Sequence, residues 1–323
     1  MRTLVAGSIA TDHLMHFPGR FSEQLIAEQL HNVSLSFLVD ALEVRRGGVA
    51  PNMCYAMAQL GARPVLVGAV GADFAEYRAW LEEHGVDCSY VLVSANQHTA
   101  RFVCTTDEDM CQIGSFYAGA MGEAADIELA PIWADAGAQL AVISAYDPAA
   151  MVKHSAECRA VGMAFVADPS QQITRMNGPD LRLLVDGAAL LFTNNYEKSL
   201  LESKTRLSDA DILAQVGVRV TTLGSRGAEI VGRDVERVHV PAAKERARVD
   251  PTGVGDAFRG GFLTARGWGL SWERAAQVGS LLATMVLETV GTQEYTVEKD
   301  DFTTRLAESY GDDCAADVLP YLS

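Results

Sequence analysis

Positive charge is scarce in this chain of 323 residues. Lys and Arg number 26 against 42 Asp and Glu, which gives a formal net charge of −16 and an isoelectric point of about 4.8. Nucleic acids and anionic membranes recruit basic surfaces, so this deficit argues against both kinds of partner. It leaves room for a small phosphorylated ligand, because a helix N-terminus and a few arginines can bind phosphate on an acidic protein.

Long apolar runs and paired cysteines are also absent. No segment approaches the roughly 18 consecutive apolar residues that a membrane helix needs. Asp12 interrupts the short apolar run at the N-terminus, which disfavours a signal peptide. The six cysteines form no C-x-x-C pair, so neither a zinc site nor a disulfide scaffold is expected. We therefore expect a cytoplasmic protein with reduced thiols.

Two common nucleotide-binding motifs are missing as well. The chain contains no Gly-Lys pair and therefore no Walker-type phosphate loop. It also lacks G-x-G-x-x-G after the first predicted strand, where a dinucleotide-binding fold would place it. Any nucleotide must be held in another way.

Short apolar runs alternate with segments of helical period through much of the chain. The runs at 2–10, 64–71 and 189–195 are typical of buried strands, and helical segments follow them. This alternation predicts an α/β fold, a mostly parallel sheet with helices on both faces. With 49% hydrophobic residues, the chain is long enough for one large domain and a small accessory element.

Two regions interrupt the alternation. Residues 32–44 alternate in polarity without a helical period, and residues 98–117 resemble two strands around the turn at 107–109. Neither can form a core alone, so together they predict a small β-sheet lid that covers a site or pairs with another subunit. We assign to the large domain residues 1–10, 47–97 and 119–323, and to the lid residues 11–46 and 98–118.

The stretch RVDPTGVGDAFRGGF (248–262) raises the question of why a carboxylate follows a glycine turn. Gly253 and Gly255 precede a predicted helix, whose N-terminus favours an anion. Asp256 then has two interpretations. It is a helix cap or first-turn acid, which is the common role, or it is a general base beside a phosphoryl group.

A second glycine turn lies upstream. Gly47 and Gly48 precede Asn52 and a helical segment that ends at Gly61. This is either an ordinary β-to-α turn with a glycine helix stop or a clamp for substrate hydroxyl groups.

Together the two stretches resemble the two signatures of the ribokinase-like (PfkB) carbohydrate kinases. The first signature matches at Gly47, Gly48, Asn52, Gly61 and Gly71. The second matches at Asp250, Gly253, Gly255, Asp256, Gly260 and Gly261. Cys54 and Val254 depart from the family's usual small residues, which should be tolerated because the backbone N–H is the working group there. GSIATDHLMHFPGRF, SLSFLVD, GGVAPN and ADPSQQI further resemble the bacterial adenosine kinases of this family.

The resemblance implies a role for each matching residue. Asp256 would be the catalytic base, and Gly253, Val254 and Gly255 would form the anion hole. Asp12, Gly47, Gly48 and Asn52 would bind the ribose hydroxyls. Asn194 and Glu197, in an N-x-x-E motif, would serve Mg²⁺ and ATP phosphate, while Thr222, Gly224 and Gly227 would lie along the nucleotide. Asp250 and Thr252 fall where relatives often bind a monovalent cation such as K⁺.

A nucleoside site also needs a flat slot and polar partners for the base. Phe37, Phe102, Phe116 and Tyr117 are candidates for stacking, although aromatic residues between a sheet and its cover are more often packing. Gln171 and Gln172 follow a predicted strand at its carboxyl end and could bind an adenine edge. Ser8 and Ser36 could add polar contacts.

Arginines near the predicted ligand loops have two interpretations. Arg45 and Arg46 are either a phosphosugar site or surface residues. Arg175, Arg226 and Arg259 could neutralise ATP phosphate, but surface charges are the commoner case.

The resemblance thus implies ATP- and Mg²⁺-dependent phosphorylation of the 5′-hydroxyl of adenosine, giving AMP and ADP in purine salvage. Two alternatives stay open: a kinase of the same family acting on ribose or fructose, and a nucleoside-binding protein without catalysis. An exposed apolar side of the lid would also suit a homodimer in which two lids pair.

Overall fold

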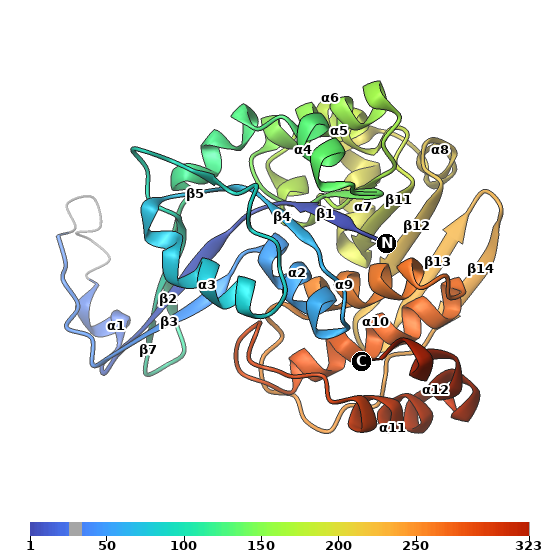
Figure 1. Cartoon of the computed structure of the whole chain (residues 1–323). Coiled ribbons are helices and arrows are strands. Elements are labelled where there is room, and N and C mark those ends of the chain that lie inside the picture. Colours follow the sequence, from blue (N-terminus) through green and yellow to red (C-terminus); the bar gives the residue numbers. More distant parts are fainter. Residues whose placement is uncertain (26–33, 323) are drawn as a thin grey trace.

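An eight-stranded sheet forms the centre of the computed structural model, which describes residues 1–25 and 34–322 (Figure 1). Its strands are β1 (Thr3–Ala6), β4 (Val65–Val67), β9 (Leu140–Ile143), β10 (Phe165–Ala167), β11 (Leu190–Asn194), β12 (Val218–Thr222), β13 (Ala228–Gly232) and β14 (Val235–Val240). Their order is β14-β13-β12-β11-β10-β9-β1-β4. All neighbours from β4 to β12 are parallel, and β13 and β14 extend the sheet in antiparallel pairs.

Helices cover both faces of this sheet, as the alternation of segments predicts. One face carries α2 (Val49–Gln59), α9 (Val254–Gly267), α10 (Trp272–Leu287) and α11 (Lys299–Tyr310); the other carries α4 (Leu129–Ala136), α5 (Pro148–Val161), α6 (Gly178–Val185) and α7 (Asn195–Thr205). Successive residues of β1 enter different cores, because Val5 packs with the first group while Leu4 and Ala6 pack with the second. Burial on both faces explains why the strands are continuous apolar runs.

A smaller sheet projects from one side of the large one (Figure 1). It contains β2 (Ala10–Phe17), β3 (Ala41–Gly47), β7 (Ala100–Asp107) and β8 (Gln112–Tyr117), in the order β3-β2-β7-β8. The two strands predicted around the turn at 107–109 are confirmed. The prediction for 32–44 is wrong in extent, since the strand begins only at Ala41 and residues 34–40 form no helix or strand; residues 32 and 33 lie outside the described residues. Strand β2 was not predicted.

The remaining elements are short connections and peripheral helices. They are α1 (Phe21–Gln24), β5 (Ala69–Val70), α3 (Ala75–Glu83), β6 (Leu92–Val93), α8 (Asp209–Gln215) and α12 (Asp312–Val318), with 3₁₀ turns at 72–74, 119–126, 170–174, 224–226 and 319–321. Within the described residues, no helix combines the length and apolar character needed to cross a membrane.

Helix α9 lies between α2 and α10, and its glycines make this possible. A side chain at Gly260 would place its Cβ 2.7 Å from the Cβ of Ala56 in α2, and one at Gly261 would lie 2.9 Å from Gly279 in α10. Close packing through small residues therefore holds the N-terminal ends of α2 and α9 beside each other, and both glycine turns with them.

Candidate active site

Helices α2 and α9 both begin at glycines that no other residue could replace without strain. Gly48, at the start of α2, has φ +94°, and an added Cβ would lie 2.5 Å from the carbonyl oxygen of Ser8. Gly253, at the start of α9, has φ +76°, and an added Cβ would lie 2.8 Å from the side chain of Thr292. Because these two glycines have positive φ, the chain can turn so that the N-termini of both helices point toward the same part of the structure.

Asp256 lies at this place, in the first turn of α9. The N-cap of α9 is Gly253, so Asp256 is not the helix cap but an acid of the first turn, the second form of that interpretation. Its Oδ2 instead accepts a hydrogen bond of 2.9 Å from Nδ2 of Asn52 in α2. Burial raises the pKa of Asp256 to about 7, against the opposing effects of the Arg259 charge and the Asn52 bond. A carboxyl with a pKa near neutrality suits a general base.

The Asn52 amide is itself oriented by a buried network that the sequence did not reveal. Nε2 of Gln293 donates to Oδ1 of Asn52 at 3.0 Å and to the hydroxyl oxygen of Tyr77 at 2.5 Å. Tyr77 in turn donates to the carbonyl oxygen of Gly47 at 3.0 Å. Because Oδ1 of Asn52 accepts from Gln293, its Nδ2 is the group that faces Asp256. Gln293 is only 1% exposed and lies 241 residues from Asn52, so no local pattern marks it.

A cavity of about 250 Å³ opens between this pair and the small sheet. Most of the predicted substrate residues line it, together with the base: Ser8, Asp12, Gly47, Gly48, Asn52, Phe102, Phe116, Gln171, Gln172, Gly253 and Asp256. Asp12, Phe102 and Phe116 occupy one cross-strand row of the small sheet and therefore share the face toward the cavity. Residues from distant parts of the sequence thus meet in one site.

Two polar residues of this cavity have distinct environments. Burial raises the pKa of Asp12 to about 6, against the positive charge of Arg45. Gln172 is buried, and within the described part of the chain its Oε1 has no hydrogen-bond partner. An unpaired buried amide oxygen is costly unless a ligand donates to it. Gln171 is exposed and accepts a hydrogen bond from Ser170.

Three predicted contacts are not placed in the cavity. Ser36 is exposed in the segment 34–40, outside both sheets, and does not line this cavity. Phe37 packs against Phe17 and Phe21, with ring centroids 5.1 and 4.9 Å away, and is a packing residue of the lid. Tyr117 follows Phe116 in β8, so its side chain lies on the opposite face of the small sheet. Its hydroxyl donates to Gln97 at 2.9 Å.

A second cavity, of about 470 Å³, lies on the other side of the same helix N-terminus. It is lined by Asn194, Thr222, Gly224, Gly227, Val254 and Gly255 from the predicted set, and by apolar side chains such as Phe258 and Leu287. Gly253 and Asp256 therefore face the first cavity, while Val254 and Gly255 face the second. The turn at 253–255 is the boundary between them.

Asn194 and Glu197 form the capping box of α7. Oδ1 of Asn194 accepts from the backbone of Glu197, and Oε2 of Glu197 accepts from the backbone of Asn194 at 2.7 Å. Burial raises the pKa of Glu197, against the charge of Arg259. One carboxylate oxygen remains for a hydrated cation, so the pair fits a supporting role toward Mg²⁺ better than direct ligation. No cluster of three or more His, Cys, Asp or Glu suited to a metal occurs among the described residues.

Asp250 and Thr252 lie together, but a protein cation already faces them. Asp250 accepts from the backbone of Thr252 at 2.9 Å and of Gly291 at 3.2 Å, and Nη1 of Arg45 lies 3.3 Å from its Oδ2. The carboxylate is therefore a poor fit for an additional K⁺ ion. Arg46 pairs with Glu294, so the two arginines are held in different ion pairs.

The arginines near the ligand loops fall into two groups. Arg175 and Arg226 are exposed, in agreement with the surface interpretation. Arg259 is 6% exposed and its Nε donates to Asp168 at 2.7 Å, so the surface interpretation is wrong for this residue. Its partner lies 91 residues away, and only the tertiary structure brings them together.

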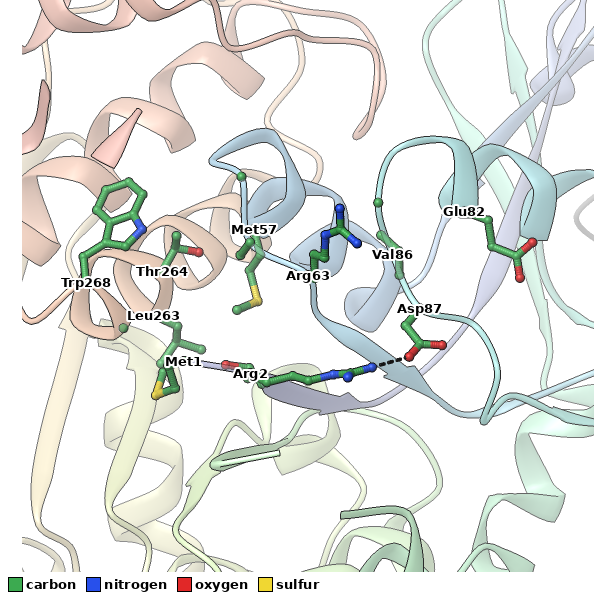
Figure 2. A pocket seen from close by; sticks show the side chains of 15 residues that line it. Met1, Arg2, Met57, Arg63, Glu82, Val86, Asp87, Leu263, Thr264 and Trp268 are labelled. Atoms are coloured by element: carbon green, nitrogen blue, oxygen red, sulfur yellow. Dashed lines mark hydrogen bonds and ion pairs between the residues drawn. The ribbon is translucent and has the colours of Figure 1, made fainter. Parts of the chain in front are cut away.

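A larger cavity, of about 640 Å³, lies at the opposite edge of the main sheet. Figure 2 shows that Arg2 crosses it to pair with Asp87, while Met57, Leu263 and Trp268 contribute from α2 and the end of α9. None of the predicted site residues lines it. The candidate site is therefore where the two glycine turns meet, at the carboxyl edge of the sheet.

A mostly parallel α/β sheet, a small β-sheet beside it and a carboxylate at a glycine-started helix define a ribokinase-like protein. The family model of the pfkB carbohydrate kinases matches residues 10–300, and the chain belongs to this family.

Several relatives are known as nucleoside kinases. The nucleoside kinase of Methanothermobacter thermautotrophicus is 29% identical over 312 residues, 95% of this chain and 96% of that protein. The structure of Burkholderia thailandensis nucleoside kinase in complex with inosine has a TM-score of 0.81 at 32% identity, over 96% of this chain and 99% of that chain. Thermotoga maritima ribokinase, at 17% identity and a TM-score of 0.72 over 98% of this chain and 99% of that chain, is similar in fold.

Proposed function

We propose that the protein is a nucleoside kinase that transfers the γ-phosphoryl group of ATP to the 5′-hydroxyl of adenosine, giving AMP and ADP, a reaction of purine salvage. One observation carries the proposal. Two cavities meet at the N-terminus of α9, and the Asp256 carboxyl, with its pKa near 7, faces only the smaller of them. Such a boundary suits in-line transfer between an acceptor on one side and a nucleotide on the other.

Each residue of the boundary has a chemical task in this proposal. Asp256 accepts the proton of the 5′-hydroxyl while that oxygen forms its bond to the γ-phosphorus and the bond to the ADP oxygen breaks. The free N–H groups at the start of α9 stabilise charge on the transferring oxygens. Asp12, Gly48 and Asn52 hold the ribose hydroxyls from the lid on one side and from α2 on the other.

The cavity of about 470 Å³, on the Gly255 side of the turn, suits ATP. Its apolar wall, with Phe258 and Leu287, and its backbone at Gly224 and Gly227 fit a base and its phosphates without a Walker loop. Bound Mg²⁺ would neutralise charge on the phosphates. Glu197 and Asn194 are the residues of this chain placed to orient its hydration shell.

A nucleoside is favoured over a free sugar by the walls of the smaller cavity. Phe102 and Phe116 offer ring faces, and Gln172 offers an unpaired buried oxygen that can accept from the edge of a purine. The relatives named nucleoside kinases support the same class. Inosine is a second candidate acceptor, because a glutamine amide can pair with either adenine or hypoxanthine by reversing its orientation.

A panel of acceptors tests the proposal. ADP formation from ATP is measured with adenosine, inosine, cytidine, ribose and fructose, and the phosphorylated product is identified by mass. We expect adenosine to give the highest kcat/KM. Efficient turnover of ribose without turnover of nucleosides would overturn the choice of substrate. Calorimetric binding of adenosine without ADP formation would indicate the non-catalytic alternative.

The lid also supports a proposal that two copies pair. Leu42, Val44 and Ile113 occupy the sheet face opposite to Asp12, and are 61%, 56% and 44% exposed. Exposed apolar residues on a small sheet suit a second copy of the same sheet. Light scattering of the wild type should give a dimer mass and that of Leu42→Asp a monomer mass; a monomeric wild type would overturn this proposal.

A further inference from the structure

Arg259 places a buried positive charge directly behind the glycine turn of α9. It follows Asp256 by three residues, hence by one helical turn, and its side chain is 7% exposed. An added Cβ at Gly255 would lie 2.7 Å from Nη1 of Arg259, so the guanidinium group is in contact distance of the turn.

The guanidinium group is fixed by a carboxylate from the other side of the site. Nε of Arg259 donates to Oδ1 of Asp168 at 2.7 Å, and Oδ2 of Asp168 accepts from the hydroxyl of Ser144 at 2.8 Å. Asp168 is 0% exposed and immediately follows β10. Both partners are thus removed from water, and the arginine cannot turn away without leaving a buried carboxylate unpaired.

The contact also gives a reason for Gly255. Its φ is not in the left-handed region, unlike that of Gly253, so its backbone could be adopted by other residues. An added Cβ would instead meet the nitrogen of Arg259 at 2.7 Å, so a side chain here would require the guanidinium group to move. A glycine at this position leaves room for the guanidinium group to approach the N–H groups of the turn from behind.

Resting on the proposed function, we propose that Arg259 is a positioning residue for phosphoryl transfer: fixed by Asp168, it supports the 253–255 turn and supplies positive charge to both the turn and Asp256. Charge on the turn favours the phosphoryl oxygens, whose negative charge is greatest during transfer. Charge beside Asp256 keeps this half-buried carboxyl ionised at a lower pH than its burial alone would allow.

The charged surroundings of Asp256 make the effect measurable. Arg259 is the cation that faces it, from its own helix, while Asp168 from the end of β10 and Glu197 from α7 add negative charge that raises its pKa further. Asn52 of α2 contributes a hydrogen bond, and the buried phenol of Tyr295 lies within its field. Removing the charge of Arg259 should therefore move the acidic limb of the kcat/KM profile to higher pH by about one unit.

The test compares Arg259→Met, Arg259→Lys and the double variant Arg259→Met with Asp168→Asn. The double variant removes both members of the ion pair, so it keeps the protein folded if the single one leaves Asp168 uncompensated. We expect a fall in kcat of about tenfold or more with KM for ATP within about threefold, since the charge acts on the transition state. Arg259→Lys should return the acidic limb toward the wild-type position.

Arg219→Met is the matched control. Arg219 is also buried, at 2% exposure, and pairs with Asp209 at 2.6 Å, but it lies near the start of β12, away from the carboxyl edge of the sheet. We expect it to lose stability and to keep the wild-type pH profile. Profiles of the Arg259 variants that superimpose on that of the wild type after scaling would overturn the inference.

A second readout separates this inference from the proposed function. The pKa of Asp256 is also measured without substrates, as the pH dependence of the stability gained on Asp256→Asn in Asp168→Asn and in the double variant, two backgrounds that differ only at Arg259. A shift of that dependence to higher pH in the double variant supports the electrostatic role even if adenosine is not the acceptor. An unchanged dependence between these two backgrounds overturns it, whatever the substrate panel shows.

Discussion

Replacing Asp256 by Asn should strongly reduce turnover and at the same time stabilise the protein. The ordinary pKa of an aspartic acid, 3.8, is raised to about 7 in the folded state, chiefly by burial. A carboxyl that binds its proton more tightly when folded destabilises the fold once it ionises. Asparagine carries no charge and can still accept the hydrogen bond from Asn52.

The expected gain in the free energy of unfolding follows from the size of the shift in the Asp256 pKa. A difference of this size in pKa corresponds to at most about 4 kcal/mol, at about 1.4 kcal/mol per unit. The side chain is only partly buried, so solvent screening reduces the figure, and we expect about 2 kcal/mol at pH 8. For a chain of this length, that corresponds to a rise in Tm of roughly 3 °C.

The stability advantage of Asp256→Asn should increase with pH. Below about pH 4, Asp256 is protonated in both the folded and the unfolded chain, so the variant has no advantage. Between pH 4 and 7 the unfolded chain ionises first, and the advantage grows. Above about pH 7 both states are ionised and the advantage is constant. Thermal or urea unfolding of ligand-free protein at several pH values measures this curve.

A control variant should show the opposite trend. Burial raises the pKa of Asp209, but its bonds to Arg219 and Lys198 outweigh that effect and bring it to about 2. Asp209→Asn should therefore lose stability above pH 4. For Asp256→Asn, kcat should fall by about 10²–10⁴. Near-wild-type turnover would remove the role of base, and a stability difference independent of pH would refute the raised pKa.

Three further predictions concern the rest of the site. Gln172→Leu should raise KM for adenosine by about tenfold or more, since a buried hydrogen bond to the base is lost; an unchanged KM in initial-rate assays would exclude that contact. Gly48→Ala should give little folded protein on circular dichroism, because its Cβ would lie 2.5 Å from a carbonyl oxygen, whereas Gly85→Ala, with open space around it, should fold. Replacing K⁺ by a large organic cation should leave kcat unchanged, because Arg45 already faces Asp250; a strong dependence on K⁺ would contradict this.

Local features of the site could be predicted from the sequence because each depends on a few neighbouring residues. Gly48 and Gly253 precede helices and do adopt positive φ at their starts. The continuous apolar runs become strands buried on both faces. Asp256 and Asn52, 204 residues apart, could be joined only through the resemblance to a family, and their hydrogen bond agrees with that joint placement.

The parts that sequence reasoning missed depend on tertiary partners. Strand β2 contains Asp12 and two histidines, so its polarity hides it; it forms because β3 and β7 pair with both of its edges. Gln293 lies in a loop after α10 and contacts Asn52 across the site. In the sequence Arg259 is typical of a surface residue, and its burial follows only from its ion pair with Asp168 in the folded protein. For Gln293 and Arg259 a polar residue is buried because a distant partner satisfies it, and such pairs leave no periodic trace.

The arrangement also resolves why a carboxylate can lie at an anion-binding turn. Asp256 and the turn share one helix N-terminus, yet they face different cavities, so a phosphoryl group on the Gly255 side and an acceptor on the Asp256 side need not compete. Burial makes the carboxyl basic enough to take a proton near pH 7, and Arg259 limits how far its pKa rises. More burial alone would leave the base protonated at neutral pH, and more positive charge alone would weaken its basicity. The reaction that we propose therefore depends on a balance between desolvation and one buried cation, and Arg259 is the residue whose removal would upset that balance without touching either ligand.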